Sequence, residues 1–248
     1  MKSHDFTASD GVRIAWHEIG EGRPFVLLHG LFSSARMNWV KFGHAEAIAA
    51  RGIRVVLPDF RAHGNSDAPH DAACYPTDIL ARDVEELVAD LGLDEYDLGG
   101  FSLGARTTAR ILVLGARPRR VVLAGMGLEG LSGWAKRKRF FLDAIAAFDT
   151  ARNGDPHWIA IQFMKTMKID RDAAALLLES FGDTEAEDLP PITQPVLVVA
   201  GNQDTDNGSA VALAEALPNA TLVAVKGTHM SSVADPALGE AIADFLAA

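Results

Sequence analysis

Apolar runs and amphipathic stretches alternate along most of the chain. Residues 24–28 and 53–57 are continuous or nearly continuous apolar runs, as expected of strands buried on both faces of a sheet. Similar short runs recur further along, between glycines and polar loops. The pattern predicts strands at 24–28, 53–57, 96–99, 120–124, 196–200 and 221–225.

The N-terminal residues predict an antiparallel hairpin. Residues 6–8 and 12–19 resemble two short strands, and in the second one apolar residues occupy alternate positions. Asp10 and Gly11 lie between them, and this dipeptide is favoured in tight hairpin turns. We therefore expect these two strands to pair at one edge of the sheet.

Helices are predicted between most of the later strands. Residues 79–91 carry apolar side chains at helical spacing, and Thr77 or Asp78 can cap the first turn. Further helices are expected over 105–114, 209–217 and 236–246, with the end of another at 45–50. Strands that alternate with helices imply an α/β fold: a mostly parallel eight-stranded sheet with helices on both faces.

Residues 128–188 differ from the rest because they contain no strand pattern. Aromatic and apolar residues, Trp134, Phe141, Ile145 and Phe148 among them, recur there at helical spacing. We predict several short helices inserted between two strands. The chain then divides into a core domain, 1–127 and 189–248, and a helical insert, 128–188.

Composition and charge narrow the function classes. The formal net charge is -10 and there is no long basic run, which argues against nucleic acid and anionic membrane surfaces as partners. Residues 136–139 form a short basic run, most simply the solvated face of a helix; attraction of an anionic substrate is the alternative. The chain has one cysteine, Cys74, and therefore no intramolecular disulfide.

The location of the protein is predicted from the same features. The N-terminal residues are too polar for a signal peptide. No apolar run approaches the ~18 residues that span a bilayer. We expect a cytoplasmic protein; its oligomeric state stays open.

Residues 100–104 match the pattern G-x-S-x-G between a predicted strand and a predicted helix. A serine on so sharp a turn takes a strained backbone conformation, and side chains two positions away would crowd it. Ser102 would then lie at a helix N-terminus, where developing negative charge is favoured. The alternative is that Ser102 only caps the helix.

A serine nucleophile needs a base and a group that orients the base. Of eight histidines, His229 follows the last predicted strand, and chemistry collects at the carboxyl ends of strands in open α/β sheets. His29 and His63 also follow strands, but each precedes a glycine and can simply shape its loop. Asp204 is favoured as the acid over Asp206 by its spacing after the strand; either could instead cap the next helix.

The order Ser102, Asp204, His229 resembles that of the α/β-hydrolase superfamily, and the resemblance covers nearly the whole chain. His29-Gly30 resembles the family's oxyanion loop. Residues 59–66 resemble its D-x-R-G-H-G-x-S loop, except that Ala62 stands where glycine is usual. In that family a helical cap is inserted where residues 128–188 fall.

The resemblance implies a carboxylic-ester hydrolase that works through an acyl-enzyme. His229 would take the Ser102 proton and Asp204 would orient the imidazole. The backbone N–H groups of Leu31 and Leu103 would stabilise the oxyanion. No metal or organic cofactor is expected, and the expected partner is a small-molecule ester. Serine rather than aspartate at the turn argues against epoxide hydrolases and haloalkane dehalogenases.

The expected substrate is small and apolar, because the residues beside these loops are apolar. We predict that four of them, Phe32, Phe101, Met126 and Met230, line its site. Trp134 of the insert is a fifth candidate, with packing as its alternative role. Two other functions stay open. The same triad can serve C–C bond, lactone, perhydrolase or hydroxynitrile lyase chemistry, and a hydrolase-fold receptor for a small signalling ligand can keep the triad.

Overall fold

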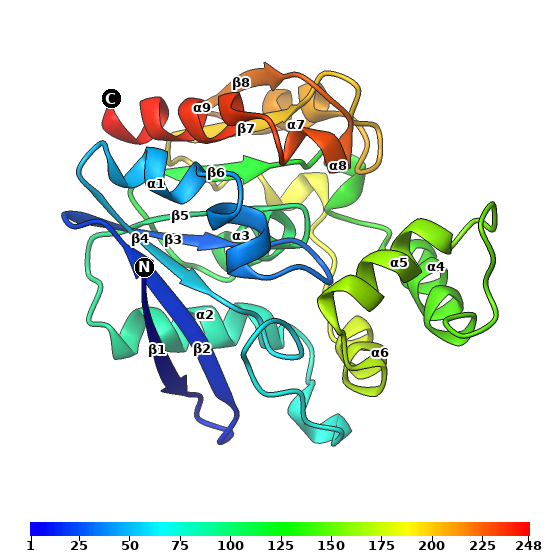
Figure 1. Ribbon diagram of the computed structural model, residues 1–248. Helices are drawn as coiled ribbons and strands as arrows, with labels where there is room; N and C mark the ends of the chain where they lie inside the picture. Colours follow the sequence, from blue (N-terminus) through cyan, green and yellow to red (C-terminus); the bar gives the residue numbers. More distant parts are fainter.

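The computed structural model describes all 248 residues and contains one eight-stranded sheet. The spatial order is β1-β2-β4-β3-β5-β6-β7-β8 (Figure 1). β1 and β2 run antiparallel to their neighbours, and all later pairs are parallel. The strands are β1 Lys2–Thr7, β2 Arg13–Ile19, β3 Arg23–Leu28, β4 Ile53–Pro58, β5 Asp97–Phe101, β6 Val121–Ala124, β7 Val196–Gly201 and β8 Ala220–Val225. The predicted fold class is confirmed.

Helices cover both faces of this sheet (Figure 1). They are α1 His44–Ala49, α2 Ile79–Asp90, α3 Leu103–Val113, α4 Trp134–Ala146, α5 Trp158–Met167, α6 Arg171–Glu179, α7 Ala210–Ala216, α8 His229–Ser232 and α9 Pro236–Ala247. A π-helical turn, η1, spans Arg36–Val40. None of the helices is both long and apolar enough to cross a membrane.

The central strands are apolar throughout because both of their faces are covered. Successive side chains of a strand point to opposite faces. Along β3, Phe25 and Leu27 pack with α1 and α9, whereas Val26 and Leu28 pack with α2 on the other side. α3 and α7 cover the continuation of that second face over β6 and β7. This is why residues 24–28 form an uninterrupted apolar run.

The N-terminal hairpin differs from its prediction. β1 covers Lys2–Thr7 instead of residues 6–8, and its partners run from Lys2↔Glu18 to Thr7↔Arg13. The connection between the strands is therefore residues 8–12, longer by one residue at each end than the predicted connection at 9–11. The sequence did not predict the first residues of β1 because they are polar. They can be polar because β1 is an edge strand that faces solvent and is held by backbone hydrogen bonds to β2.

The start of α2 also differs from expectation. Asp78 precedes the helix in a left-handed conformation, φ +63°, and its side chain makes no cap hydrogen bond. Its carboxylate instead accepts two hydrogen bonds from Arg110 of α3, at 2.9 and 2.8 Å. The acidic residue predicted to cap one helix therefore ties α2 to α3.

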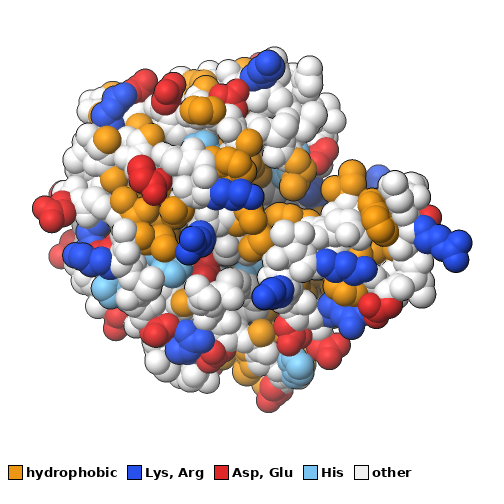
Figure 2. All heavy atoms as spheres, in the orientation of Figure 1, with side chains coloured by type: hydrophobic (Ala, Val, Ile, Leu, Met, Phe, Trp, Pro, Cys, Tyr) orange, Lys and Arg blue, Asp and Glu red, His pale blue; other side chains and the backbone are white.

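Residues 128–188 form helices α4, α5 and α6, with short 3-10 turns at Leu128–Gly130 and Ala186–Asp188, and no strand. These helices lie beside the body of the molecule (Figure 1). They share a small apolar cluster with Phe32 of the core, against which Ala144, Ile161 and Met164 pack. Hydrophobic side chains also gather along the junction between body and helices (Figure 2). The domain boundaries themselves stay a prediction.

Candidate active site

Ser102 lies between the last residue of β5 and the first residue of α3. Its backbone takes φ +55° and ψ -111°, a conformation that residues other than glycine rarely adopt. A Cβ on Gly100 would lie 2.4 Å from the carbonyl carbon of Gly104, and a Cβ on Gly104 would lie 2.4 Å from the carbonyl oxygen of Leu28. Only glycine fits at either position, as the crowding argument predicts.

Two side chains from distant parts of the sequence meet Ser102. His229 Nε2 lies 3.0 Å from the Ser102 hydroxyl oxygen, and His229 Nδ1 lies 2.9 Å from an Asp204 carboxylate oxygen. Asp204 follows β7, and His229 begins α8 after β8. Because these strands are parallel, their carboxyl ends lie at the same end of the sheet. The predicted trio is therefore adjacent in space.

The two hydrogen bonds of His229 define its chemistry. With Nδ1–H donating to the carboxylate, Nε2 keeps a lone pair that can accept the serine proton. The Asp204 side chain is only 4% exposed, so little water competes for it. The ring of Phe101 lies against the imidazole, with 5.0 Å between centroids, and limits its movement. The arrangement can activate a hydroxyl and hold a transferred proton.

The two candidate acids have different surroundings. Asp206 is exposed and its backbone N–H donates to the second carboxylate oxygen of Asp204, at 3.1 Å. No hydrogen bond or ion pair joins Asp206 to His229. The spacing argument therefore selected the carboxylate that lies beside the imidazole.

Asn207 is a site neighbour that the sequence did not single out. It is buried, its Nδ2 donates to the Gly125 carbonyl at 2.8 Å, and the same atom lies 3.5 Å from His229 Nδ1. Since both of those nitrogens donate elsewhere, this is a packing contact. An asparagine in a loop ordinarily indicates only a turn, so no sequence signal distinguished it.

The two predicted oxyanion donors have available N–H groups. Leu103 is the first residue of α3, so its N–H has no acceptor within the helix. The N–H groups of Gly30 and Phe32 donate to Asn38 and His63, whereas that of Leu31, between them, donates to no group. Their role in catalysis stays a proposal.

His29 and His63 hold the oxyanion loop in place. His29 Nε2 accepts the Phe60 N–H at 3.0 Å, and His63 Nε2 accepts the Phe32 N–H at 2.9 Å. Burial lowers the pKa of His29, and it lowers the pKa of His63 to about 3. Both rings therefore stay neutral and keep a nitrogen that can accept a backbone hydrogen bond. The geometry favours the loop-shaping role for both.

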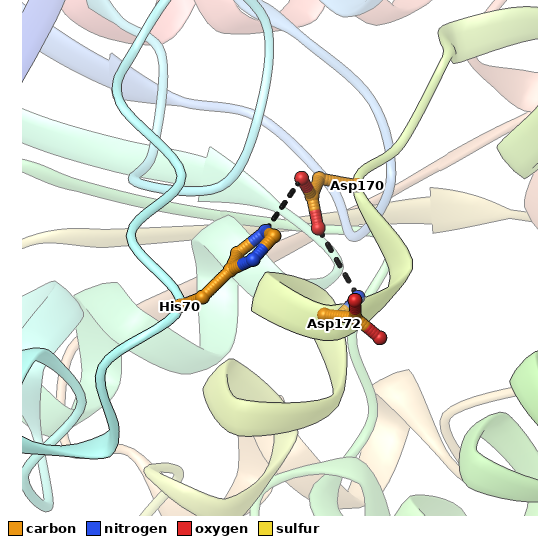
Figure 3. A group of neighbouring side chains, drawn as sticks. All are labelled: His70, Asp170 and Asp172. Atoms are coloured by element: carbon orange, nitrogen blue, oxygen red, sulfur yellow. Dashed lines mark hydrogen bonds and ion pairs between the residues drawn. The ribbon is translucent and has the colours of Figure 1, made fainter.

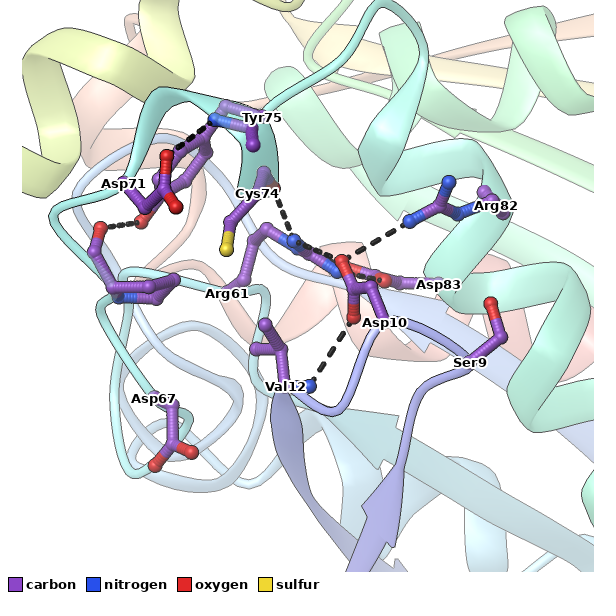
Figure 4. A network of polar contacts seen from close by, with 12 residues as sticks. Ser9, Asp10, Val12, Arg61, Asp67, Asp71, Cys74, Tyr75, Arg82 and Asp83 are labelled. Carbon is purple, nitrogen blue, oxygen red and sulfur yellow. Dashed lines mark hydrogen bonds and ion pairs between the residues drawn. The ribbon is translucent and has the colours of Figure 1, made fainter.

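The loop of residues 59–66 is anchored by a buried arginine (Figure 4). Arg61 donates to both carboxylate oxygens of Asp83, at 2.7 and 2.6 Å, and to Asp10 at 3.0 Å, as well as to the Cys74 carbonyl. Burial alone would lower the pKa of the guanidinium, but the two carboxylates more than offset this and raise it. Ala62, at the position where the family loop has glycine, takes φ +61°, the conformation that glycine would adopt without strain.

The predicted substrate-lining residues have different environments. Phe32, Phe101 and Met126 are buried beside the oxyanion loop, His229 and the insert. Trp134 is also buried, and its Nε1 donates to the Leu178 carbonyl at 2.8 Å. Met230 is 54% exposed. Their contact with substrate stays a prediction.

A small cavity opens near the nucleophile turn, between α2, α3 and residues 180–182. Leu103 is the only predicted site residue on its wall. The remaining wall is partly charged: Asp78, Leu80, Ala81, Arg106, Thr107, Arg110, Ser180, Phe181 and Gly182.

One cluster has the composition of a metal site. The donor atoms of His70, Asp170 and Asp172 lie within 4.8 Å of one another at the surface (Figure 3). However, both oxygens of Asp170 already accept protein hydrogen bonds: one from His70 at 2.8 Å, the other from the N–H groups of Asp172 and Ala173 in the first turn of α6. The cluster is thus explained as a helix cap joined to a loop of the core.

The comparisons with known proteins agree with this architecture. A model of the Alpha/beta hydrolase family matches residues 25–241. The chain belongs to this family. Among alpha/beta hydrolases it is 26% identical to the non-heme chloroperoxidase CPO-A1 of Kitasatospora aureofaciens, with 90% of each chain aligned. It is 29% identical to the non-heme chloroperoxidase of Streptomyces lividans, over 89% of this chain and 90% of that one.

Solved structures of alpha/beta hydrolases superpose over nearly the whole chain. A hydrolase from Pseudomonas aeruginosa PA01 is 26% identical, with a TM-score of 0.80 over 99% of this chain and 98% of the other. The esterase RhEst1 from Rhodococcus sp. ECU1013 is 25% identical, with a TM-score of 0.75 over 100% and 99%. The similarity to these structures extends over the core and the insert alike.

Proposed function

We propose that the protein is a serine hydrolase that cleaves small carboxylic esters through an acyl-enzyme. One observation carries the proposal: His229 joins the Ser102 hydroxyl, at 3.0 Å, to the Asp204 carboxylate, at 2.9 Å. Both distances lie within the reach required of a nucleophile and its base. The strained backbone of Ser102 supports it, because strain of this kind collects at functional sites.

The proposed reaction has two halves. As the Ser102 oxygen attacks the ester carbonyl, His229 Nε2 takes its proton and then gives it to the departing alcohol. Asp204 keeps the imidazole in the required tautomer and stabilises its protonated form. A water molecule, deprotonated by the same nitrogen, then attacks the acyl-enzyme and releases the acid.

The tetrahedral intermediates need donors for the oxyanion. The N–H groups of Leu31 and Leu103 are proposed for this task. Loss of one such donor typically costs about 3 kcal/mol of transition-state stabilisation. The buried His63 bond to the adjacent Phe32 N–H supports the role of the loop, because it fixes the backbone there before substrate binds.

An apolar acyl or alcohol group is the proposed substrate feature. Phe32 and Phe101 adjoin the oxyanion loop and the imidazole, and Phe32 also meets Phe141 of α4 edge-on, with 5.6 Å between centroids. The likeness to an esterase over the whole chain supports an ester as substrate. A cytoplasmic location stays a prediction.

A second candidate is transfer of the acyl group to hydrogen peroxide. It is favoured by the likeness to two proteins named non-heme chloroperoxidase over about nine-tenths of the chain. The first half-reaction is unchanged, and peroxide replaces water in the second. Formation of peracid from p-nitrophenyl acetate and hydrogen peroxide, with release of p-nitrophenol, would reveal it.

Turnover of p-nitrophenyl esters of increasing chain length tests the main proposal. We expect wild-type turnover and a loss of several orders of magnitude in Ser102→Ala. Binding of an ester without turnover in the wild type would contradict it and favour a hydrolase-fold receptor.

A further inference from the structure

The basic run at residues 136–139 of α4 is not uniformly solvated. Lys138 pairs with Glu179 of α6 at 2.6 Å, and Arg139 pairs with Asp143 one turn along α4 at 2.9 Å. Both of these are surface pairs, and the Arg139 side chain is 78% exposed. Arg137, which precedes both in the sequence, behaves differently.

Arg137 reaches the loop that carries the candidate acid. Its Nη1 donates to the backbone carbonyl of Asp206, at 2.9 Å, and to the side-chain oxygen of Asn207. α4 and this loop are far apart in sequence, so these bonds tie the helical insert to the carboxyl end of β7. A backbone carbonyl and a buried amide are fixed acceptors, which makes the tie specific.

The same loop residues contact the triad directly. Asp206 donates its N–H to Asp204 at 3.1 Å, and Asn207 lies 3.5 Å from His229 Nδ1 while its Nδ2 is held by Gly125. A displacement of Asp206 would therefore move the Asp204 carboxylate. A displacement of Asn207 would change the packing against the His229 imidazole. Misplacement by about 1 Å can cost roughly 100-fold in rate.

The charge of Arg137 acts on the same groups. Burial lowers the pKa of its guanidinium and nearby Arg106 lowers it further, while Asp206 and Asp204 oppose this. An arginine nevertheless stays charged at neutral pH. The charged groups around the loop are thus Asp204 and Asp206 within it, Arg137 from α4, Arg106 from α3, and Glu129, whose carboxylate accepts the Ser209 N–H at 2.7 Å.

We propose that Arg137 is a positioning residue for the hydrolytic reaction: it holds the Asp204 loop through Asp206 and Asn207 and so couples the seating of α4 to the assembly of the triad. This inference rests on the proposed function. It assigns to the insert a role in arranging the catalytic groups.

The test compares kcat and KM for a p-nitrophenyl ester in four proteins: wild type, Arg137→Met, Arg137→Lys and the surface control Arg139→Met. We expect Arg137→Met to lower kcat about 10- to 100-fold with little change in KM. Arg137→Lys keeps a charged donor and should restore part of kcat, and Arg139→Met should match wild type.

Two results would overturn the inference. Arg137→Met could equal Arg139→Met in kcat, or it could raise KM with kcat unchanged, which would mean substrate binding instead of positioning. If Arg137→Met does not fold, Arg137→Gln removes the charge and must lower kcat with KM little changed. An inactive wild type overturns both proposals, whereas an active wild type with a silent Arg137→Met overturns only this one.

Discussion

Replacing Arg61 with methionine tests how the loop beside the active site is held. The Arg61 side chain is 0% exposed and makes two hydrogen bonds to Asp83, whose side chain is 4% exposed (Figure 4). Its other carboxylate partner, Asp10, keeps a hydrogen bond from Arg82 at 3.1 Å. The substitution therefore leaves one carboxylate, that of Asp83, buried and without a cation.

The expected cost follows from that orphaned charge. Removing one partner of a buried ion pair typically destabilises a protein by about 3–5 kcal/mol. At this chain length that corresponds to a fall in Tm of roughly 6–20 °C. Breaking the exposed pair of Arg139 by substitution to methionine should cost only about 0–1 kcal/mol. Urea unfolding followed by circular dichroism measures both values.

The pH dependence has a defined sign. Burial raises the pKa of Asp83 in the wild type, although Arg61 opposes this. Without Arg61, the pKa of Asp83 in the folded state should lie further above the unfolded value. The folded state then binds more protons, and the stability of the variant rises as pH falls through that raised pKa. The loss relative to wild type should be larger at pH 8 than at pH 5. The double variant Arg61→Met/Asp83→Leu should recover at least about half of it, because no charge is left buried.

Two results would refute this reasoning. A loss below about 1 kcal/mol for Arg61→Met would mean that the buried pair is not a major contributor. An equal loss in the single and double variants would mean that lost packing, and not the orphaned carboxylate, causes the destabilisation.

Three further predictions concern the turn, the acid and the surface contact of the insert. Gly104→Ala should destabilise by about 1–3 kcal/mol or more, seen in urea unfolding, because its methyl would meet the Leu28 carbonyl. Asp204→Asn should lower kcat about 10⁴-fold, whereas Asp206→Asn should change it less than about threefold; equal losses would remove Asp204 from its assigned role. The hydrogen bond with Asp170 raises the pKa of His70. Its stabilisation should be complete below about pH 6.5 and vanish as pH rises through the raised value, so the Tm difference between wild type and His70→Ala should be larger at pH 6 than at pH 9.

The fold was predictable because its signals are local and periodic. Residues 24–28 form an apolar run because both faces of their strand are buried. Residues 79–91 have apolar side chains at helical spacing because only one face of their helix is buried. β1 was misjudged because an edge strand held by backbone pairing needs few apolar side chains. Asp78 was misjudged because its partner, Arg110, lies on another helix, which no local pattern reveals.

The candidate site was predictable where its residues follow strands. Ser102, Asp204 and His229 each follow the carboxyl end of a strand, so the topology alone brings them to the same end of the sheet. Asn207 and Arg137 were not found, because their importance depends on where the insert sits against the loop after β7. Long-range packing of that kind leaves no periodic signal in one sequence.

The most direct test of the central claim is labelling with a fluorophosphonate, which reacts fastest with an activated serine hydroxyl. We predict one adduct per chain, located on Ser102 by peptide mass spectrometry, with labelling abolished in Ser102→Ala and strongly slowed in His229→Ala. An unlabelled wild type, or an adduct on any other residue, would contradict the assignment of Ser102 as the nucleophile.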